Sequence, residues 1–338
     1  MESKIFSVDG RDDIVDNIIE HYEKSFTPGT KPEPMTIGEA RIEKFSDGEI
    51  SANFKESIRN RRIYLVCSMN NSDNIIKLLM AVDAAKRASA AEIIVVAPYF
   101  GYARQDRKDG VRGSIGGKVM ADVLQVVGID RMIVIDLHAD QIQGFFNTPV
   151  DHVEGQYIFT KYVKTLLDSG EIKAPVLCSP DAGGVKRVDL FYKKLVKEYA
   201  DEGITMAMLS KRRDKPNSIA SMELIGDVRG RDVIIIDDMI DTAGTLEKAS
   251  HMLKERGAKT IRAIATHGVL SGKALQNICN SSLDELIISD TLALDPEWAT
   301  KCKEVSGIDV TILSCTKLLA SVIKAINNNF SVDQLKEQ

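Results

Sequence analysis

The sequence predicts an α/β fold in which mainly parallel β-sheets, flanked by helices, are divided between two domains. Short apolar runs recur along the chain, helical periodicity fills most of the gaps, and 338 residues exceed the usual size of one hydrophobic core. Strands that alternate with helices are connected in the way that parallel sheets require. The strand-like runs lie at residues 62–68, 92–100, 131–138, 174–181, 204–211, 232–238, 260–270, 284–290 and 309–315.

Helical periodicity is clearest where apolar side chains recur on one stripe of a helix. Residues 74–88, 185–199 and 246–256 show this pattern, which is typical of helices that cover one face of a sheet. A last amphipathic helix is predicted at residues 316–327. These segments supply the crossover connections between the predicted parallel strands.

The strands fall into two sets, and the second set begins near residue 155. We therefore expect an N-terminal domain at residues 1–154 and a C-terminal domain at residues 155–312. A final helix at residues 313–338 is expected to pack back on the N-terminal domain. Residues 22–44 hold three of the nine prolines and show no clear periodicity, which predicts a surface loop.

The composition excludes several classes of function. Hydrophobic content of 44% and charged content of 28% are typical of a globular protein, and a net charge of −5 gives no reason to expect nucleic-acid binding. The five cysteines are scattered without a CxxC pair, so disulfides and a structural zinc site are not expected and a cytoplasmic location fits. No apolar stretch predicts a signal peptide or a membrane span.

The most informative segment is Val-Ile-Ile-Ile-Asp-Asp-Met-Ile-Asp-Thr-Ala-Gly-Thr at residues 233–245. Four branched aliphatic residues predict a strand buried on both faces, and ligands of parallel sheets gather beyond the carboxyl ends of such strands. Small residues at the start of the following helix can offer backbone N–H groups to a phosphate. The alternative is an ordinary helix with Thr242 or Thr245 as its N-cap. A capped helix does not require the three carboxylates at the end of the strand.

Two motifs of the N-terminal domain carry aromatic and charged residues next to predicted turns. Phe45 could stack on a base while Asp47 and Glu49 accept hydrogen bonds from its amine, although an exposed turn would look the same. Residues 97–108 place Tyr and Phe beside arginines and a lysine just past a strand end, a grouping that suits polyphosphate oxygens. A solvated basic turn is the alternative for the second motif.

Three further motifs follow strands. His138 comes after a buried strand and could be a metal ligand, a general base or a structural histidine. Asp181 ends a strand before a pair of glycines that opens a helix, which predicts a second anion-binding turn. Residues 210–217 carry Lys211 and Arg213 on a predicted loop, either as a solvated charge run or as a catalytic loop.

The acid-tipped segment at residues 233–245 resembles the phosphoribosyl-diphosphate (PRPP) binding motif of the phosphoribosyltransferase superfamily. With the other motifs in this order, nearly the whole chain from residue 45 resembles the ribose-phosphate diphosphokinase (PRPP synthetase) family. The motifs that carry the resemblance are Phe-Ser-Asp-Gly-Glu at 45–49, Pro-Tyr-Phe-Gly-Tyr-Ala-Arg-Gln-Asp-Arg-Lys at 98–108, Asp-Leu-His at 136–138, Gln-Ile-Gln-Gly-Phe-Phe at 141–146, Ser-Pro-Asp-Ala-Gly-Gly-Val-Lys-Arg at 179–187 and Thr-His-Gly-Val-Leu-Ser at 266–271.

The resemblance implies two phosphoribosyltransferase-like domains and an enzyme of nucleotide biosynthesis. Such an enzyme transfers the diphosphoryl group of ATP to the C1 hydroxyl of ribose 5-phosphate, with Mg²⁺, giving PRPP and AMP. The implied ATP contacts are Phe45, Asp47, Glu49, Arg104, Gln105 and Asp106, the first three from a neighbouring subunit. The implied ribose 5-phosphate and PRPP contacts are Asp237, Asp238, Asp241, Thr242, Ala243, Gly244 and Thr245.

The resemblance also implies catalytic, metal-binding and regulatory residues. Lys211 and Arg213 match the family's catalytic loop, and His138 and Asp181 match its magnesium contacts. A homo-oligomer built from dimers, such as a hexamer, is implied, with phosphate or ADP as regulators. Positions that resemble an allosteric anion site are Ser57, Arg59, Ser89 and Ser314, although they could be ordinary surface residues.

Asn147 departs from the family pattern, which commonly has Asp after the Phe-Phe pair, so a metal contact there is not expected. Two other functions remain as alternatives. A PRPP-consuming phosphoribosyltransferase would lack the ATP-side motifs. A catalytically silent subunit associated with the synthetase would be expected to carry a disrupted catalytic loop or PRPP loop.

Overall fold

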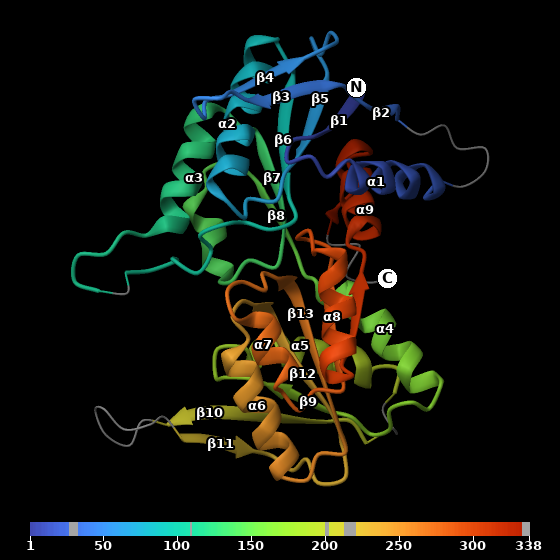
Figure 1. Cartoon of the computed structure of the whole chain (residues 1–338). Helices are drawn as coiled ribbons and strands as arrows, with labels where there is room; N and C mark the ends of the chain where they lie inside the picture. Colours follow the sequence, from blue (N-terminus) through green and yellow to red (C-terminus); the bar gives the residue numbers. More distant parts are fainter. Residues whose placement is uncertain (27–32, 109, 200–202, 213–220, 333–338) are drawn as a thin grey trace. The chain divides into compact units, whose positions relative to one another are not determined.

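A computed structural model describes residues 1–26, 33–108, 110–199, 203–212 and 221–332 of the chain (Figure 1). The chain divides into two compact units. Unit 1 combines Met1–Glu154 with Cys315–Gln338, and unit 2 is Gly155–Ser314.

The described residues of unit 1 form a six-stranded sheet with the order β2-β1-β5-β6-β7-β8, in which every neighbouring pair is parallel. Consecutive residues of the central strands point to opposite faces of the sheet and are buried, so both faces are covered, as is usual for parallel sheets. The strands are β1 (Ser3–Ser7), β2 (Met35–Ile37), β5 (Arg62–Val66), β6 (Glu92–Ala97), β7 (Arg131–Ile135) and β8 (Val150–Val153).

Helices cover both faces of this sheet (Figure 1). The apolar stripes of α2 and α3 join one core cluster with Phe6, Leu65 and Val95 of the sheet. The buried stripes of α1 and α9 pack together on the other side. The helical segments of unit 1 are α1 (Asp12–Lys24), α2 (Ser72–Arg87), α3 (Gly116–Val127), η1 (Asp140–Phe145) and α9 (Thr316–Asn327).

Asn327 at the end of α9 ties the last helix to the first strands. Its Oδ1 accepts from Ser3 Oγ at 3.1 Å and from Tyr64 OH at 2.9 Å, and its Nδ2 donates to Tyr22 OH at 3.1 Å. Burial makes each of these bonds costly to lose. The chain therefore returns from unit 2 to complete the polar interior of unit 1.

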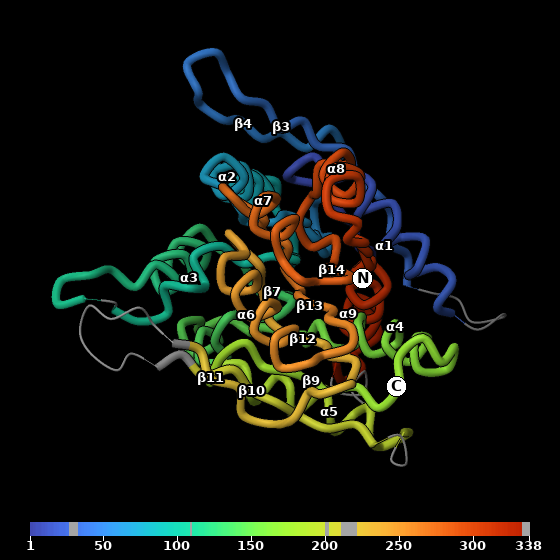
Figure 2. The backbone as a smooth tube through the Cα atoms, turned by 60° about the horizontal axis from the view of Figure 1, so that its bottom comes forward, coloured from blue at the N-terminus to red at the C-terminus, as the bar shows by residue number. Residues whose placement is uncertain are grey.

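A separate antiparallel hairpin, β3 (Ala40–Lys44) with β4 (Ile50–Phe54), projects from the body of unit 1 (Figures 1 and 2). An ion pair of 2.6 Å between Lys44 Nζ and Asp73 Oδ2 links the tip end of β3 to α2. The hairpin tip carries the first sequence motif.

The described residues of unit 2 form a seven-stranded sheet with the order β11-β10-β9-β12-β13-β14-β15. All neighbours are parallel except the edge pair of β10 with β11. The strands are β9 (Val176–Ser179), β10 (Thr205–Arg212), β11 (Ser221–Ile225), β12 (Asp232–Ile240), β13 (Thr260–Gly268), β14 (Glu285–Ser289) and β15 (Asp309–Leu313).

Two apolar clusters fill the two faces of this sheet. One joins α6, α7 and α8 to alternate residues of β12 and β13, and the other joins α4 and α5 to the intervening residues. The helices are α4 (Gln156–Asp168), α5 (Val185–Val196), α6 (Gly244–Glu255), α7 (Ala274–Cys279) and α8 (Pro296–Ser306).

The predicted α/β fold with mainly parallel sheets is confirmed, and each predicted strand-like run contains a strand. The predicted surface loop at residues 22–44 is wrong in part, because it contains the end of α1 and the strands β2 and β3. Short edge strands and hairpins leave weak patterns in a sequence, since their stability depends on neighbours. No helix in the described parts of the chain has the length and apolar character needed to cross a membrane.

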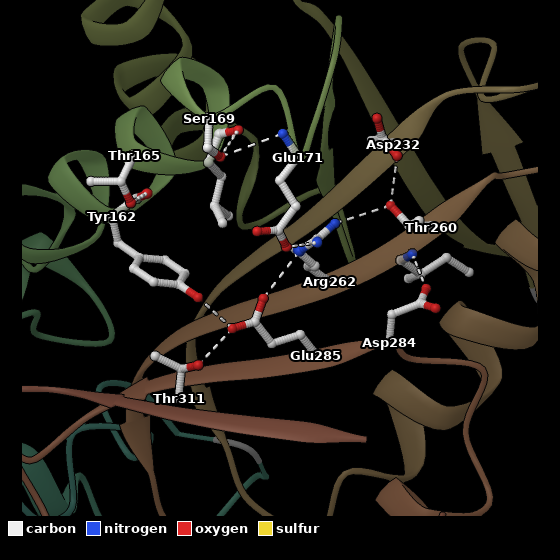
Figure 3. Close-up of polar contacts among 12 residues, drawn as sticks. Tyr162, Thr165, Ser169, Glu171, Asp232, Thr260, Arg262, Asp284, Glu285 and Thr311 are labelled. Atoms are coloured by element: carbon white, nitrogen blue, oxygen red, sulfur yellow. Dashed lines mark hydrogen bonds and ion pairs between the residues drawn. The ribbon is translucent and has the colours of Figure 1, made fainter. Parts of the chain in front are cut away.

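A polar network closes the amino edge of the unit 2 sheet (Figure 3). Glu285 accepts from Arg262 Nε at 3.0 Å, from Tyr162 OH at 2.6 Å and from Thr311 Oγ1 at 2.6 Å. The side chains of Arg262 and Glu285 are only 8% and 9% exposed. The network therefore joins α4 to three neighbouring strands through a nearly buried charge pair.

We expect Glu285→Gln to lower the free energy of unfolding by about 3 kcal/mol, because it removes the buried carboxylate from Arg262 and leaves the more exposed Glu171 to balance the charge. Urea unfolding followed by circular dichroism measures this change. Glu297→Gln is the matched control, since Glu297 pairs with Lys301 on an exposed helix surface and should change stability by less than about 1 kcal/mol. Equal unfolding midpoints for the two variants would contradict the structural role of the network.

Candidate active site

Asp237 and Asp238 lie within β12, not beyond it as predicted from the sequence. The strand continues two residues further, with Asp237 paired to Ala265 and Ile240 paired to Gly268 of β13. The Asp238 side chain is 4% exposed, whereas that of Asp237 is 35% exposed. The pair thus places one carboxylate at the solvent-facing edge and the other in the interior.

Arg187 reaches both carboxylates from the first turn of α5. Its Nη1 lies 3.5 Å from Asp237 Oδ1 and 3.4 Å from Asp238 Oδ1. Burial, followed by the neighbouring charge of Asp238, raises the pKa of the Asp237 carboxyl well above its ordinary value, and Arg187 partly offsets this. Arg187 was not predicted as a site residue, and its place just after a glycine pair is the signal that the sequence offers for it.

The turn that holds Asp181 lies at the same edge, because β9 is the parallel neighbour of β12. Asp181 Oδ1 accepts from Gly184 N at 3.0 Å, and Ser179 Oγ donates to the Asp181 carbonyl at 2.6 Å. A Cβ at Gly184 would lie 2.8 Å from Ser179 Oγ, so any other residue there would have to displace that hydroxyl. The turn's own aspartate therefore accepts one of its N–H groups, and anion binding by this turn stays a prediction.

The segment from Asp241 to Thr245 joins β12 to α6. Ala243 has φ of 60°, and no side chain caps the start of α6. The simple alternative of a helix capped by Thr242 or Thr245 is therefore wrong. Both threonines are exposed, which leaves the first turn of α6 accessible to an anion.

The carboxyl edge of the unit 1 sheet carries the second and third motifs. Arg104, Gln105 and Asp106 occupy the turn after β6, and His138 follows the adjacent parallel strand β7. Gln141 Nε2 donates to Asp106 Oδ2 at 3.0 Å, which joins the two motifs. The structure thus brings these predicted residues to one edge, where Arg104, Gln105 and His138 are exposed.

Phe45, Asp47 and Glu49 form the exposed tip of the β3–β4 hairpin. Phe45 N donates to the Glu49 carbonyl at 2.7 Å, and Glu49 N donates to Asp47 Oδ1 at 3.0 Å. Phe45 is 51% exposed, an unusual state for a large aromatic side chain. These contacts fix the turn and leave the aromatic face accessible.

The two predicted catalytic-loop residues are only partly covered by the structure. Lys211 belongs to β10, but its side chain is outside the description, and Arg213 lies outside the described residues. Their roles therefore rest on the sequence pattern.

Three of the predicted regulatory residues lie near the amino edge of the unit 1 sheet. Asn60 N donates to the Ser89 carbonyl at 2.9 Å, which brings the exposed turn with Ser57 and Arg59 next to Ser89. Ser314 is the last residue of unit 2.

Comparison with known proteins bears directly on these motifs. The N-terminal domain of ribose phosphate pyrophosphokinase matches residues 3–128, and a phosphoribosyl synthetase-associated domain matches residues 198–336. A ribose-phosphate pyrophosphokinase of Porphyromonas gingivalis is 44% identical over 300 residues, covering 88% of this chain and 90% of the relative. The chain belongs to the ribose-phosphate pyrophosphokinase family.

Further members of the family agree in length and fold. A ribose-phosphate pyrophosphokinase of Vibrio cholerae is 44% identical over 305 residues, covering 89% of this chain and 92% of the relative. The crystal structure of phosphoribosylpyrophosphate synthetase from Mycobacterium smegmatis has a TM-score of 0.83 at 31% identity, covering 97% of this chain and 100% of that chain. The resemblance drawn from the sequence motifs is confirmed.

The raised pKa of Asp237 predicts a pH dependence of stability. The folded state holds the proton above the ordinary carboxyl pKa of 3.8, whereas the unfolded state releases it, so this group makes stability fall as pH rises. We expect Asp237→Asn to remove this contribution and to gain stability relative to wild type between about pH 5 and about pH 8. Thermal unfolding of both proteins across that range measures the difference. Parallel curves would contradict the raised pKa.

Proposed function

We propose that the chain transfers the β,γ-diphosphoryl group of ATP to the C1 hydroxyl of ribose 5-phosphate, giving PRPP and AMP. The observation that carries the proposal is the carboxyl edge of unit 2. There, the Asp237 and Asp238 pair lies beside the uncapped start of α6 in a member of the ribose-phosphate pyrophosphokinase family. Carboxylates suit ribose hydroxyls, and an open helix start suits a phosphate.

On the acceptor side, we assign Asp237, Asp238 and Asp241 to the ribose hydroxyls. The N–H groups from Thr242 to Thr245 bind the 5-phosphate. Arg187 balances the acid pair when the hydroxyls are absent, since its Nη1 is within 3.5 Å of both. Because Arg187 already orients the acid pair, the two side chains bind the ribose hydroxyls without reorganising, which is favourable for binding.

On the donor side, we assign ATP to the unit 1 motifs. The exposed Phe45 ring of one subunit stacks on the adenine bound by its neighbour. Asp47 and Glu49 accept hydrogen bonds from the same base. Arg104, Gln105 and Asp106 line the ATP site. The bond from Gln141 to Asp106 holds that turn beside His138.

Mg²⁺ fits the available side chains as an ion held mainly by ATP. In the residues that the structure describes, no three His, Cys, Asp or Glu side chains lie together as a metal site. Mg²⁺ commonly takes one or two carboxylates and fills its other positions with phosphate oxygens and water. The exposed carboxylate of Asp181 is suited to one such contact, and His138 to a second. The ion would neutralise phosphate charge.

Attack on phosphorus spreads negative charge over the equatorial oxygens, so positioning and cations carry most of the catalysis. Lys211, near the end of β10, and Arg213, which follows it in the sequence, supply these cations, which is our proposal from the sequence pattern. Closure of such a segment would exclude water and suppress hydrolysis of ATP.

The alternatives explain fewer residues. A PRPP-consuming transferase has no use for the motifs at Phe45–Glu49 and Arg104–Asp106. A silent subunit has no need to retain Lys211 and Arg213, both present in the sequence. A coupled assay of AMP formation from ATP, with and without ribose 5-phosphate, separates these functions: only the proposed enzyme forms AMP in response to the sugar.

We expect Lys211→Ala to lower kcat by about 10²-fold or more, because a transition-state donor is lost. AMP formation at saturating ATP and ribose 5-phosphate measures this change. Lys193→Ala is the control, since Lys193 pairs with Asp189 on the exposed surface of α5 and should leave kcat within about twofold of wild type. Wild-type turnover in Lys211→Ala would exclude the catalytic role.

We also propose a cytoplasmic homo-oligomer built from dimers, with an anion site between subunits to which Ser57, Arg59, Ser89 and Ser314 contribute. The bond from Asn60 N to the Ser89 carbonyl supports part of this site, because it places the Arg59 turn beside Ser89. Activity measured against phosphate concentration, with and without ADP, tests this regulation.

A further inference from the structure

We infer that Ser271 and Asn277 are positioning residues, which hold the segment 241–245 in its ligand-binding conformation before the ligand arrives. This inference rests on the proposed function, because it treats that segment as the ribose 5-phosphate site. Neither residue was given a role from the sequence, although Ser271 ends the Thr-His-Gly-Val-Leu-Ser motif.

Ser271 fixes the carboxylate of Asp241. Its Oγ donates to Asp241 Oδ1, and hydrogen bonds to ionised acceptors are stronger than those between neutral groups. Leu270 N donates to the Ile240 carbonyl at 3.0 Å, immediately beside this contact. The segment after β13 therefore binds both the end of β12 and the first residue of the ligand-binding segment.

Asn277 fixes the next peptide group. Its Nδ2 donates to the Thr242 carbonyl at 2.7 Å, and a Cβ at Gly244 would lie 3.6 Å from the same nitrogen. A planar trans peptide points its N–H opposite to its carbonyl. Because the Thr242 carbonyl is directed at α7, the Ala243 N–H points away from α7, so Asn277 sets the direction of one of the proposed phosphate donors.

The segment that carries Ser271 is itself anchored in the core of unit 2. The Thr266 carbonyl accepts from Ser289 Oγ at 2.6 Å and from Thr291 Oγ1 at 3.0 Å, and His267 Nδ1 lies 3.0 Å from Thr291 Oγ1. These residues are almost completely buried. Ser271 is thus a short extension of a rigid strand end.

The backbone on both sides of the contact needs such support. Ala243 has φ of 60° and Leu270 has φ of 49°, in the left-handed region that residues other than glycine rarely adopt. Conformations of this kind persist where their surroundings hold them, and they are typical of ligand-binding segments. Loss of either bond should therefore weaken ligand binding by allowing the free segment to leave this conformation.

The test compares Ser271→Ala and Asn277→Ala with wild type by steady-state kinetics and by calorimetric titration of ribose 5-phosphate without ATP. We expect each variant to raise the KM and Kd for ribose 5-phosphate about fivefold to tenfold, as expected for one lost hydrogen bond. The KM for ATP and the melting temperature should stay close to wild type. Ser271→Thr keeps the hydroxyl and should bind ribose 5-phosphate as wild type does.

Gln276→Ala, next to Asn277 on α7, controls for perturbation of the helix and should change neither constant. Unchanged ribose 5-phosphate binding in both alanine variants would overturn the inference. So would a lowered melting temperature with equal losses for both substrates, because that result indicates a general structural role. If wild type forms no AMP yet binds ribose 5-phosphate, and the variants weaken that binding, the proposed reaction fails while the positioning role stands.

Discussion

The contact of Arg187 with Asp237 and Asp238 joins two motifs of unit 2 that are far apart in the sequence. Adjacent carboxylates at the end of a strand buried on both faces repel each other and lose hydration, which raises the pKa of Asp237. A cation at 3.4–3.5 Å offsets part of that cost and leaves the acids oriented. The turn before α5 determines where Arg187 lies, so the arrangement of the edge depends on the parallel pairing of β9 with β12.

The charged groups at the two edges of the unit 2 sheet have different surroundings. At the amino edge, Glu285 and Arg262 satisfy each other within the protein, together with neighbouring hydroxyls (Figure 3). At the carboxyl edge, the start of α6 has no side-chain cap and Asp237 is partly exposed. Ligands of parallel sheets bind beyond the carboxyl ends of the strands, so the helix start that no side chain caps at this edge indicates a place for a ligand.

Sequence periodicity and motif order were sufficient for the fold class, for the helices α2, α5, α6 and α9, and for the acid-tipped strand. The length of β12 was not predictable, because Met239 and Ile240 pair with β13 through backbone bonds that no side-chain pattern records. The hairpin β3–β4 was missed for a similar reason, since only one of the ten residues in its two strands is buried and its pattern is weak. Arg187, Ser271 and Asn277 act through tertiary contacts, which only the folded chain brings together.

The central claim is that the carboxyl edge of unit 2 binds ribose 5-phosphate in a conformation already present in the free chain. A crystal structure of the protein with ribose 5-phosphate tests it most directly. The account predicts phosphate oxygens about 3 Å from the backbone nitrogens of Ala243, Gly244 and Thr245, and ribose hydroxyls on the Asp237 pair. It also predicts that the bonds from Ser271 to Asp241 and from Asn277 to Thr242 persist. Ribose 5-phosphate bound elsewhere, or a rebuilt 241–245 segment, would contradict it.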